Sequence, residues 1–208
     1  MKDLRSSIKD IQRHVGAEVD GIFGPATAAA VLRELRGEDA KAPHPLMNGA
    51  DDLDTRTLGI LATMDPKAVP MFGRFMRLAK ATAATLGCDY VLIGGNRTWK
   101  EQDALYAQGR TKPGAKVTNA KGGQSNHNFG IAADAGVFLA GAYLDGGNKS
   151  QQQLAAKVHR ACSEHAATCG LEWGGSWKSL TDLPHYEVAT GLTMATKRKL
   201  YQAEGSIL

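Results

Sequence analysis

The chain has 208 residues, a formal net charge of +4 and 43% hydrophobic residues, which is enough for one sizeable domain and a smaller module. Its three cysteines form no CxxC pair, which argues against a disulfide framework and predicts free thiols. The basic residues are scattered rather than gathered in a stripe with interleaved aromatic residues, so we expect no nucleic-acid partner.

The N-terminal region is expected to be a small helical module. In residues 1–37, apolar positions recur at helical spacing on either side of a break at Asp20-Gly21. Residues 38–54 carry two prolines, a glycine and several acids, a composition typical of a linker. No apolar run follows the charged N-terminus or is long enough to span a bilayer. We therefore expect synthesis in the cytoplasm without a signal peptide, and no membrane insertion.

Residues 55–208 are expected to form a domain that mixes helices and strands. Its expected elements are a helix over 69–86 ended by Gly87, a strand over 90–93, a helix from Trp99 to Gly109, a long loop over 111–126 and a helix over 151–168 ended by Gly170. Thr98 and Glu101 have the spacing of a capping box, which marks the start of the second helix.

Two short segments contain the candidate chemistry. His127 and Asp134 lie seven residues apart around Gly130, and Asp182 precedes His185 by three. Two histidines and one carboxylate, with water in the fourth position, are a common catalytic zinc arrangement, and a further carboxylate can act as general base. Residues seven apart on a straight strand face opposite sides, so we expect His127 to precede the strand and the chain to bend at Gly130.

These segments also carry a resemblance. The pattern SxHxxGxAxD is filled at every position from Ser125 to Asp134, and D-x-x-H follows from Asp182. Together they resemble the M15 zinc peptidases, the family of VanY, D-alanyl-D-alanine carboxypeptidases and phage L-alanyl-D-glutamate endolysins. The resemblance implies an α+β fold of the Hedgehog/DD-peptidase-like type, with a small antiparallel sheet flanked by helices. The segment from Gln108 to Gln124 is most similar to the phage branch.

The resemblance also implies roles for individual residues. His127, Asp134 and His185 correspond to ligands of a Zn2+ cofactor, and Asp182 to the general base that activates a water molecule. Arg97 matches an arginine that stabilises developing negative charge. The other interpretations are that Asp182 is a turn residue and that Arg97 forms a surface ion pair.

Four further residues are candidates for the surroundings of the site. Ser125 is expected to support a zinc ligand or the substrate, and Glu187 to orient His185. Trp173 and Trp177 flank two glycines and are candidate substrate-binding residues; the sequence leaves open whether they line a cleft or close the core.

A rival metal cluster lies on the helix expected over 151–168. Its members are His159, Cys162, His165 and Cys169. One straight helix rarely surrounds an ion with four ligands, and this arc overlaps the apolar face of the helix. We therefore expect these side chains to pack in the core.

The N-terminal module suggests a substrate. The residues from Asp20 to Thr27 resemble the DGxFGPxT signature of a three-helix peptidoglycan-binding module, in which we expect Phe23 to fill the small core. Both resemblances together imply a monomeric phage-type endolysin that a separate pore protein releases to the wall, where it lyses the cell by cleaving the L-alanyl-D-glutamate bond of peptidoglycan. The alternatives are a D-alanyl-D-alanine carboxypeptidase or dipeptidase, and a non-catalytic, zinc-stabilised cell-wall-binding protein.

Overall fold

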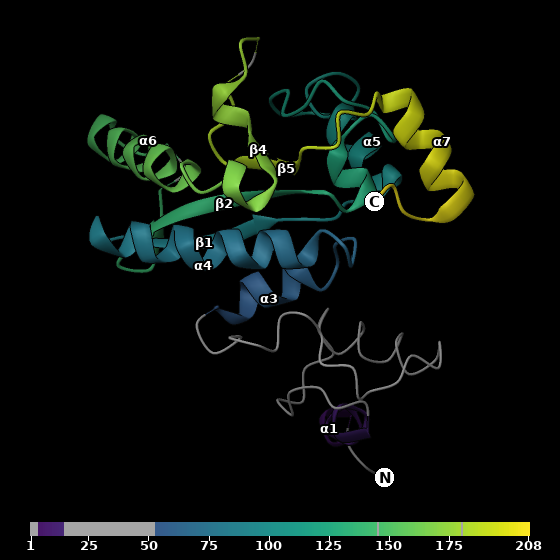
Figure 1. The fold of residues 1–208 in the computed structure, drawn as a ribbon, viewed down its shortest axis with the longest axis horizontal. Coiled ribbons are helices and arrows are strands. Elements are labelled where there is room, and N and C mark those ends of the chain that lie inside the picture. The colour runs from purple at the N-terminus through teal and green to yellow at the C-terminus, as the bar shows by residue number, and fades with distance from the viewer. Residues whose placement is uncertain (1–3, 15–52, 145, 180) are drawn as a thin grey trace.

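The computed structural model describes residues 4–14, 53–144, 146–179 and 181–208 (Figure 1). Of the expected module over 1–37, only helix α1 (Leu4–His14) is described. The signature from Asp20 to Thr27 and most of the linker over 38–54 lie outside the described residues. The fold below is therefore that of residues 53–208.

This domain mixes helices and strands, as the sequence predicted. The α-helices are α3 (Thr55–Leu61), α4 (Val69–Thr85), α5 (Trp99–Ala107), α6 (Lys149–Ser163) and α7 (Met194–Glu204). The 3-10 helices are η2 (Asn126–Phe129), η3 (Ala167–Cys169) and η4 (Gly174–Ser176). The strands are β1 (Asp89–Gly94), β2 (Ala132–Leu139), β3 (Ala142–Tyr143), β4 (Leu171–Trp173) and β5 (His185–Val188). No described helix is both long enough and apolar enough to span a membrane.

Local sequence explains where the predicted helices begin and end. In α4, Phe72, Phe75, Met76 and Ala79 are fully buried, as their helical spacing predicted. The chain leaves this helix through Gly87, whose φ of 73° suits a residue without a Cβ. Helix α5 starts with the predicted capping box, in which Thr98 and Glu101 satisfy each other's backbone amides. Helices α3 and α7 were not predicted.

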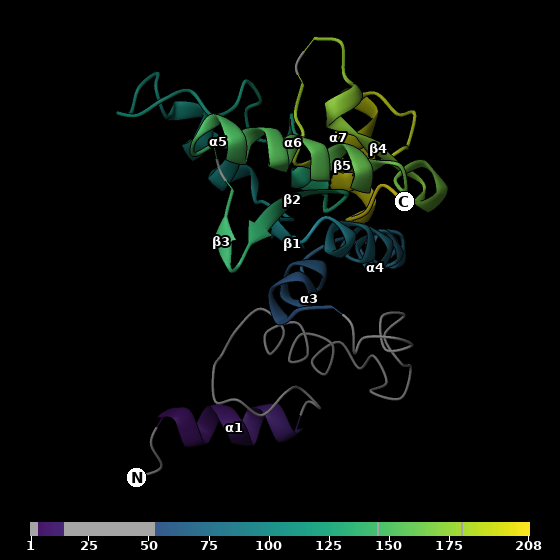
Figure 2. The same ribbon diagram turned by 90° about the vertical axis from the view of Figure 1, so that its left-hand side faces the viewer.

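The sheet is antiparallel and has the strand order β1-β2-β5-β4, with β3 paired to β2. The β2–β3 hairpin projects from the body of the domain (Figure 2). Because side chains alternate along a strand, β5 divides its residues between two faces. Tyr186 faces the core, where its ring centroid lies 4.3 Å from that of Phe75 in α4. His185 and Glu187 face the opposite side of the sheet.

The helix expected over 151–168 is shorter than predicted. Helix α6 ends at Ser163, and the chain then turns through η3 to Gly170, whose φ is 75°. Of the rival metal cluster, only His159 and Cys162 lie on α6, while His165 turns away to the Thr82 hydroxyl, 2.8 Å from its Nε2.

Three members of the rival cluster, His159, Cys162 and Cys169, are buried in the core as predicted, whereas His165 is only partly buried. His159 Nδ1 lies 2.8 Å from the Tyr90 hydroxyl, and Cys162 Sγ donates to the Ala79 carbonyl at 3.3 Å. All three cysteines are buried free thiols. Burial raises the pKa of Cys162 to about 12, so this thiol stays protonated and unreactive at neutral pH.

Candidate metal centre

The turn after η2 brings His127 to the sheet. Gly130 ends η2 in the left-handed conformation, with φ of 67°, and β2 begins two residues later. A Cβ on Gly130 would lie 2.6 Å from the backbone nitrogen of Asp65, which donates to the Gly130 carbonyl. The position therefore requires glycine for both its dihedral angle and its close backbone contact. This is the bend that the spacing of His127 and Asp134 predicted.

Strand pairing brings the second histidine to the same place. Asp134 on β2 lies directly opposite His185 on β5. Asp134 Oδ1 lies 3.1 Å from His185 Nδ1 and 3.3 Å from His127 Nε2. Each of the three side chains offers one ligand atom, and these atoms all lie within 4.8 Å of one another. Among the described residues, no other group of three His, Cys, Asp or Glu side chains meets this condition. Residues 51 positions apart in sequence thus form one cluster.

Hydrogen bonds on the far side of each imidazole fix which nitrogen faces the cluster. His127 Nδ1 lies 2.8 Å from the Gly95 carbonyl, which can only accept, so Nδ1 carries the proton and Nε2 is free. His185 Nε2 lies 2.9 Å from Glu187 Oε2, which leaves Nδ1 toward Asp134. The cluster therefore offers two imidazole nitrogens and one carboxylate oxygen, a donor set that suits zinc and leaves a fourth position open.

The electrostatics of the cluster favour a positive charge at its centre. Burial acts to raise the pKa of Asp134, but its interactions with the imidazoles of His127 and His185 outweigh the effect of burial and lower that pKa. Burial acts to lower the pKa of His185, but the carboxylates of Asp134 and Glu187 outweigh it and raise that pKa to about 9. Without metal, the protonated imidazole of His185 supplies this positive charge. A bound metal cation would replace that proton.

Asp182 approaches the cluster from the loop before β5. Its backbone nitrogen donates to the Gly174 carbonyl at 3.1 Å, and its carbonyl accepts from the His185 nitrogen at 3.3 Å. Burial raises the pKa of Asp182; the imidazole of His185 opposes this rise and the charge of Asp134 adds to it. A carboxyl group with a raised pKa close to a metal site is suited to accept and return a proton.

Arg97 is tied to the segment that carries His127. Its backbone nitrogen donates to the His127 carbonyl at 3.0 Å, and its Nη1 donates to Gln102 Oε1 at 2.8 Å. Gln102 is fully buried and also donates to the Ala120 carbonyl at 2.8 Å, inside the long loop over 111–126. The guanidinium is thus held by a neutral amide that also fixes the loop.

The three predicted substrate-binding residues occupy different positions. Trp177 borders the cluster, with its ring centroid 5.0 Å from that of His185. Trp173 donates from Nε1 to the Leu183 carbonyl at 2.8 Å and so braces the loop that carries Asp182. Ser125 precedes η2, and its carbonyl accepts from the Asn128 nitrogen at 3.0 Å.

Two features of the centre escaped the sequence analysis. The Nζ of Lys197 on α7 is buried and donates to Asn126 Oδ1 at 2.8 Å, directly before His127. Gly94 lies beside Asp134, where an added Cβ would come within 3.1 Å of Asp134 Oδ2. Both depend on contacts between segments distant in sequence, and no local pattern marks either residue.

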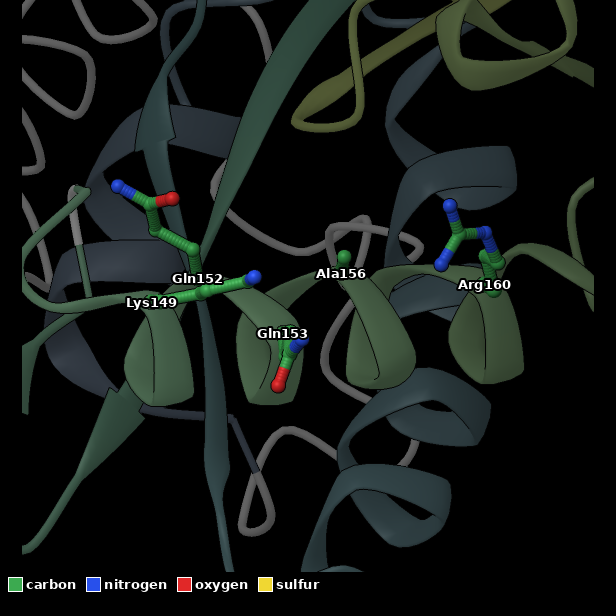
Figure 3. Close-up of a pocket in the computed structure, with 5 residues that line it drawn as sticks. All are labelled: Lys149, Gln152, Gln153, Ala156 and Arg160. Carbon is green, nitrogen blue, oxygen red and sulfur yellow. The ribbon is translucent and has the colours of Figure 1, made fainter.

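A surface hollow lies away from this cluster. It is lined by side chains along helix α6, namely Lys149, Gln152, Gln153, Ala156 and Arg160 (Figure 3). None of these residues belongs to the His-Asp-His cluster, and all come from one helix. The hollow is therefore a feature of one helix surface and separate from the metal centre.

Comparison with known proteins agrees with this geometry. Residues 118–188 match a peptidase M15 family described as D-alanyl-D-alanine carboxypeptidase. The chain is 44% identical over 115 residues to the peptidoglycan L-alanyl-D-glutamate endopeptidase CwlK of Bacillus subtilis (strain 168), a match that spans 52% of this chain and 66% of that protein. The segment of this chain that matches the family contains all three residues of the cluster and Asp182.

Two solved structures are also similar. The L-Ala D-Glu endopeptidase ChiX of Serratia marcescens is 26% identical, with a TM-score of 0.43 over 69% of this chain and 95% of that one. The D,D-pentapeptidase VanY from the VanB-type resistance cassette, a mutant form in complex with Zn(II), is 19% identical, with a TM-score of 0.40 over 69% of this chain and 80% of that one.

Proposed function

Because this chain belongs to the M15 peptidase family, we propose that it is a zinc-dependent peptidoglycan peptidase that cleaves the bond between L-alanine and D-glutamate in the stem peptide. The observation that carries the proposal is the His127, Asp134 and His185 cluster with Asp182 held beside it. The 44% identity to CwlK supports the choice of bond.

The donor set fits the proposed metal. His127 Nε2, His185 Nδ1 and a carboxylate oxygen of Asp134 would hold zinc, and the arrangement leaves one position for water or substrate. A bound zinc ion supplies a Lewis acid, which polarises the scissile carbonyl and acidifies water. Gly95 and Glu187 keep both imidazoles in the required tautomer through their hydrogen bonds.

Asp182 supplies the proton transfers in this proposal. Its carboxylate takes a proton from the attacking water and returns it to the nitrogen of the leaving D-glutamate, so the amide bond breaks without release of a free amide anion. The contacts of its backbone with Gly174 and His185 fix the loop that carries this side chain.

In this proposal, Arg97 and Trp177 contact the substrate. Arg97 offers a positive charge next to the His127 segment, where it would stabilise negative charge that develops on the scissile carbonyl oxygen. Trp177 forms a flat apolar wall beside His185, against which the substrate would lie. These two roles concern binding and orientation, whereas Asp182 moves the proton.

The bond that is cleaved can be read from a digest. Purified peptidoglycan would be incubated with the full chain and the products analysed by mass spectrometry. A new D-glutamate amino terminus is the expected product. Loss of terminal D-alanine alone would support the second candidate, a D,D-carboxypeptidase, which the description of the matched family favours.

We further propose that residues 1–37 bind the wall and that the enzyme acts as a phage-type endolysin. The support is the sequence from Asp20 to Thr27. The test is sedimentation of the Asp182→Ala variant with insoluble peptidoglycan, with and without residues 1–37. Binding that depends on those residues is expected, and equal binding by both forms would refute a wall-binding module.

A further inference from the structure

Helix α7 buries a lysine behind the metal centre. Lys197 has only 5% of its surface exposed, although lysine is rarely buried without a partner. Its Nζ donates to Asn126 Oδ1 at 2.8 Å. α6 and α7 lie on opposite sides of the view in Figure 1, and the bond to Asn126 joins α7 to the first residue of η2. A charge that is costly to bury is therefore held next to the segment that carries a proposed ligand.

Asn126 connects this lysine to the second histidine. Its carbonyl oxygen accepts from Lys197, and its side chain also hydrogen-bonds to Glu187. Because an ionised carboxylate only accepts, the amide nitrogen of Asn126 is the donor in that bond. Glu187 in turn accepts from His185 Nε2 at 2.9 Å. A continuous chain of contacts thus runs from Lys197 to a proposed metal ligand.

The same lysine compensates two neighbouring carboxylates. Glu172 on β4 lies directly opposite Glu187 on β5, an arrangement of like charges that destabilises an antiparallel pair. Both carboxylates interact electrostatically with Lys197. The lysine is therefore placed to offset the repulsion between these two carboxylates, one of which holds His185 through its Nε2.

We propose that Lys197 is a positioning residue for the metal centre, acting through Asn126 on the segment of His127 and through Glu187 on the orientation of the His185 ring. The proposal rests on the zinc site proposed above. Loss of the lysine would remove one of the hydrogen bonds that fix the Asn126 amide, and with it the positive charge beside Glu187 and Glu172. The His127 segment and the His185 ring would then be held less firmly, and zinc affinity would fall.

The test compares Lys197→Met with Lys199→Met in the full chain. Methionine keeps most of the length of lysine and removes its charge, and Lys199 is an exposed lysine two residues along the same helix. For each variant, the zinc dissociation constant would be measured by competition with a chromogenic chelator. The melting temperature would be measured in excess chelator and reports the stability of the metal-free protein. We expect Lys197→Met to raise the zinc dissociation constant about 10- to 100-fold, and Lys199→Met to leave it unchanged.

A double-mutant cycle separates positioning from general stability. If Lys197 acts through Glu187, its removal should weaken zinc binding much less in a Glu187→Gln background than in the wild type. Unchanged zinc affinity in Lys197→Met, or effects that simply add in the double variant, would overturn the proposal. If Lys197→Met does not fold, Lys197→Gln would be judged by the same criteria.

The wild-type chain in the same titration tests the underlying function separately. Stoichiometric zinc binding and hydrolysis of a stem peptide by the wild type, combined with normal zinc affinity in Lys197→Met, would reject only the role of Lys197. A wild-type chain that binds no zinc would reject the proposed function itself.

Discussion

Two buried histidines on opposite faces of the sheet have opposite charge preferences. His185 lies between the carboxylates of Asp134 and Glu187, and its pKa is raised to about 9. On the other face, His159 contacts the Tyr90 hydroxyl, and burial lowers its pKa to about 4. Both side chains are almost inaccessible, so their partners, more than burial, determine which one attracts a cation.

The core face also shows how a polar group can be buried without making a site. The Tyr90 hydroxyl lies 3.0 Å from that of Tyr186 and 2.8 Å from His159, and the three form a neutral network. Tyr186 is the residue directly after His185. Alternation along β5 therefore places a packing residue and a proposed metal ligand side by side in sequence and on different faces in space.

The largest expected effect comes from a change on the charged face. Asp134→Ala removes the carboxylate that contacts both histidines. We therefore expect this variant to lose zinc binding, and we expect its rate of hydrolysis to fall to that of the uncatalysed reaction. Zinc content by mass spectrometry and release of stem-peptide fragments would measure both. His159→Gln is the matched control on the core face and should keep both zinc and activity. Equal losses in the two variants would remove the distinction between the faces.

Replacing Asp182 separates metal binding from proton transfer. Asp182→Ala should lower the rate about 10²- to 10⁴-fold, the usual contribution of a general base, while the zinc content stays that of the wild type. Asp182→Asn keeps the shape of the side chain and should lose the same activity. Retained activity in either variant would exclude Asp182 as the base.

The core face predicts a pH effect on stability. Because the pKa of His159 falls from 6.5 to about 4 on folding, its contribution is complete above pH 6.5 and is lost as the pH falls toward 4. Over this window, with chelator present, the wild type should lose up to about 3 kcal/mol more unfolding free energy than His159→Gln. Urea unfolding at a series of pH values measures the difference. Parallel curves for the two proteins would contradict the assignment of a neutral buried imidazole.

The smallest effect concerns room for the ligand carboxylate. In Gly94→Ala the new methyl group would press on Asp134 Oδ2, so the carboxylate must move by a few tenths of an ångström. We expect zinc affinity to fall by about tenfold or less, because the fold can absorb such a shift. Gly59→Ala is the control, since a Cβ there meets nothing within 4 Å, and calorimetric zinc titration would compare them. Identical affinities would show that Asp134 does not depend on Gly94.

Local sequence was sufficient to predict much of this centre. The seven-residue spacing of His127 and Asp134 required a bend, and Gly130 provides it in the left-handed conformation. Helix α4 and the capping box of α5 also followed from local patterns, because periodicity and capping depend on nearby residues.

Contacts between distant segments were not predictable in the same way. The burial of Lys197 and the approach of Gly94 to Asp134 depend on how α7 and β1 meet the sheet. The early end of α6 at Ser163 has a similar origin, because His165 turns to Thr82 on α4 instead of continuing the helix. Tertiary contacts override local propensity at each of these places.

The most direct test of the central claim is hydrolysis of a stem peptide that contains the L-alanyl-D-glutamate bond, before chelation, after it and after zinc is returned. The account predicts one zinc ion per chain, cleavage at that bond, loss of cleavage with the metal and recovery when zinc is restored. Cleavage that persists in metal-free protein, or a zinc-loaded chain that binds peptidoglycan and never cleaves it, would contradict the account.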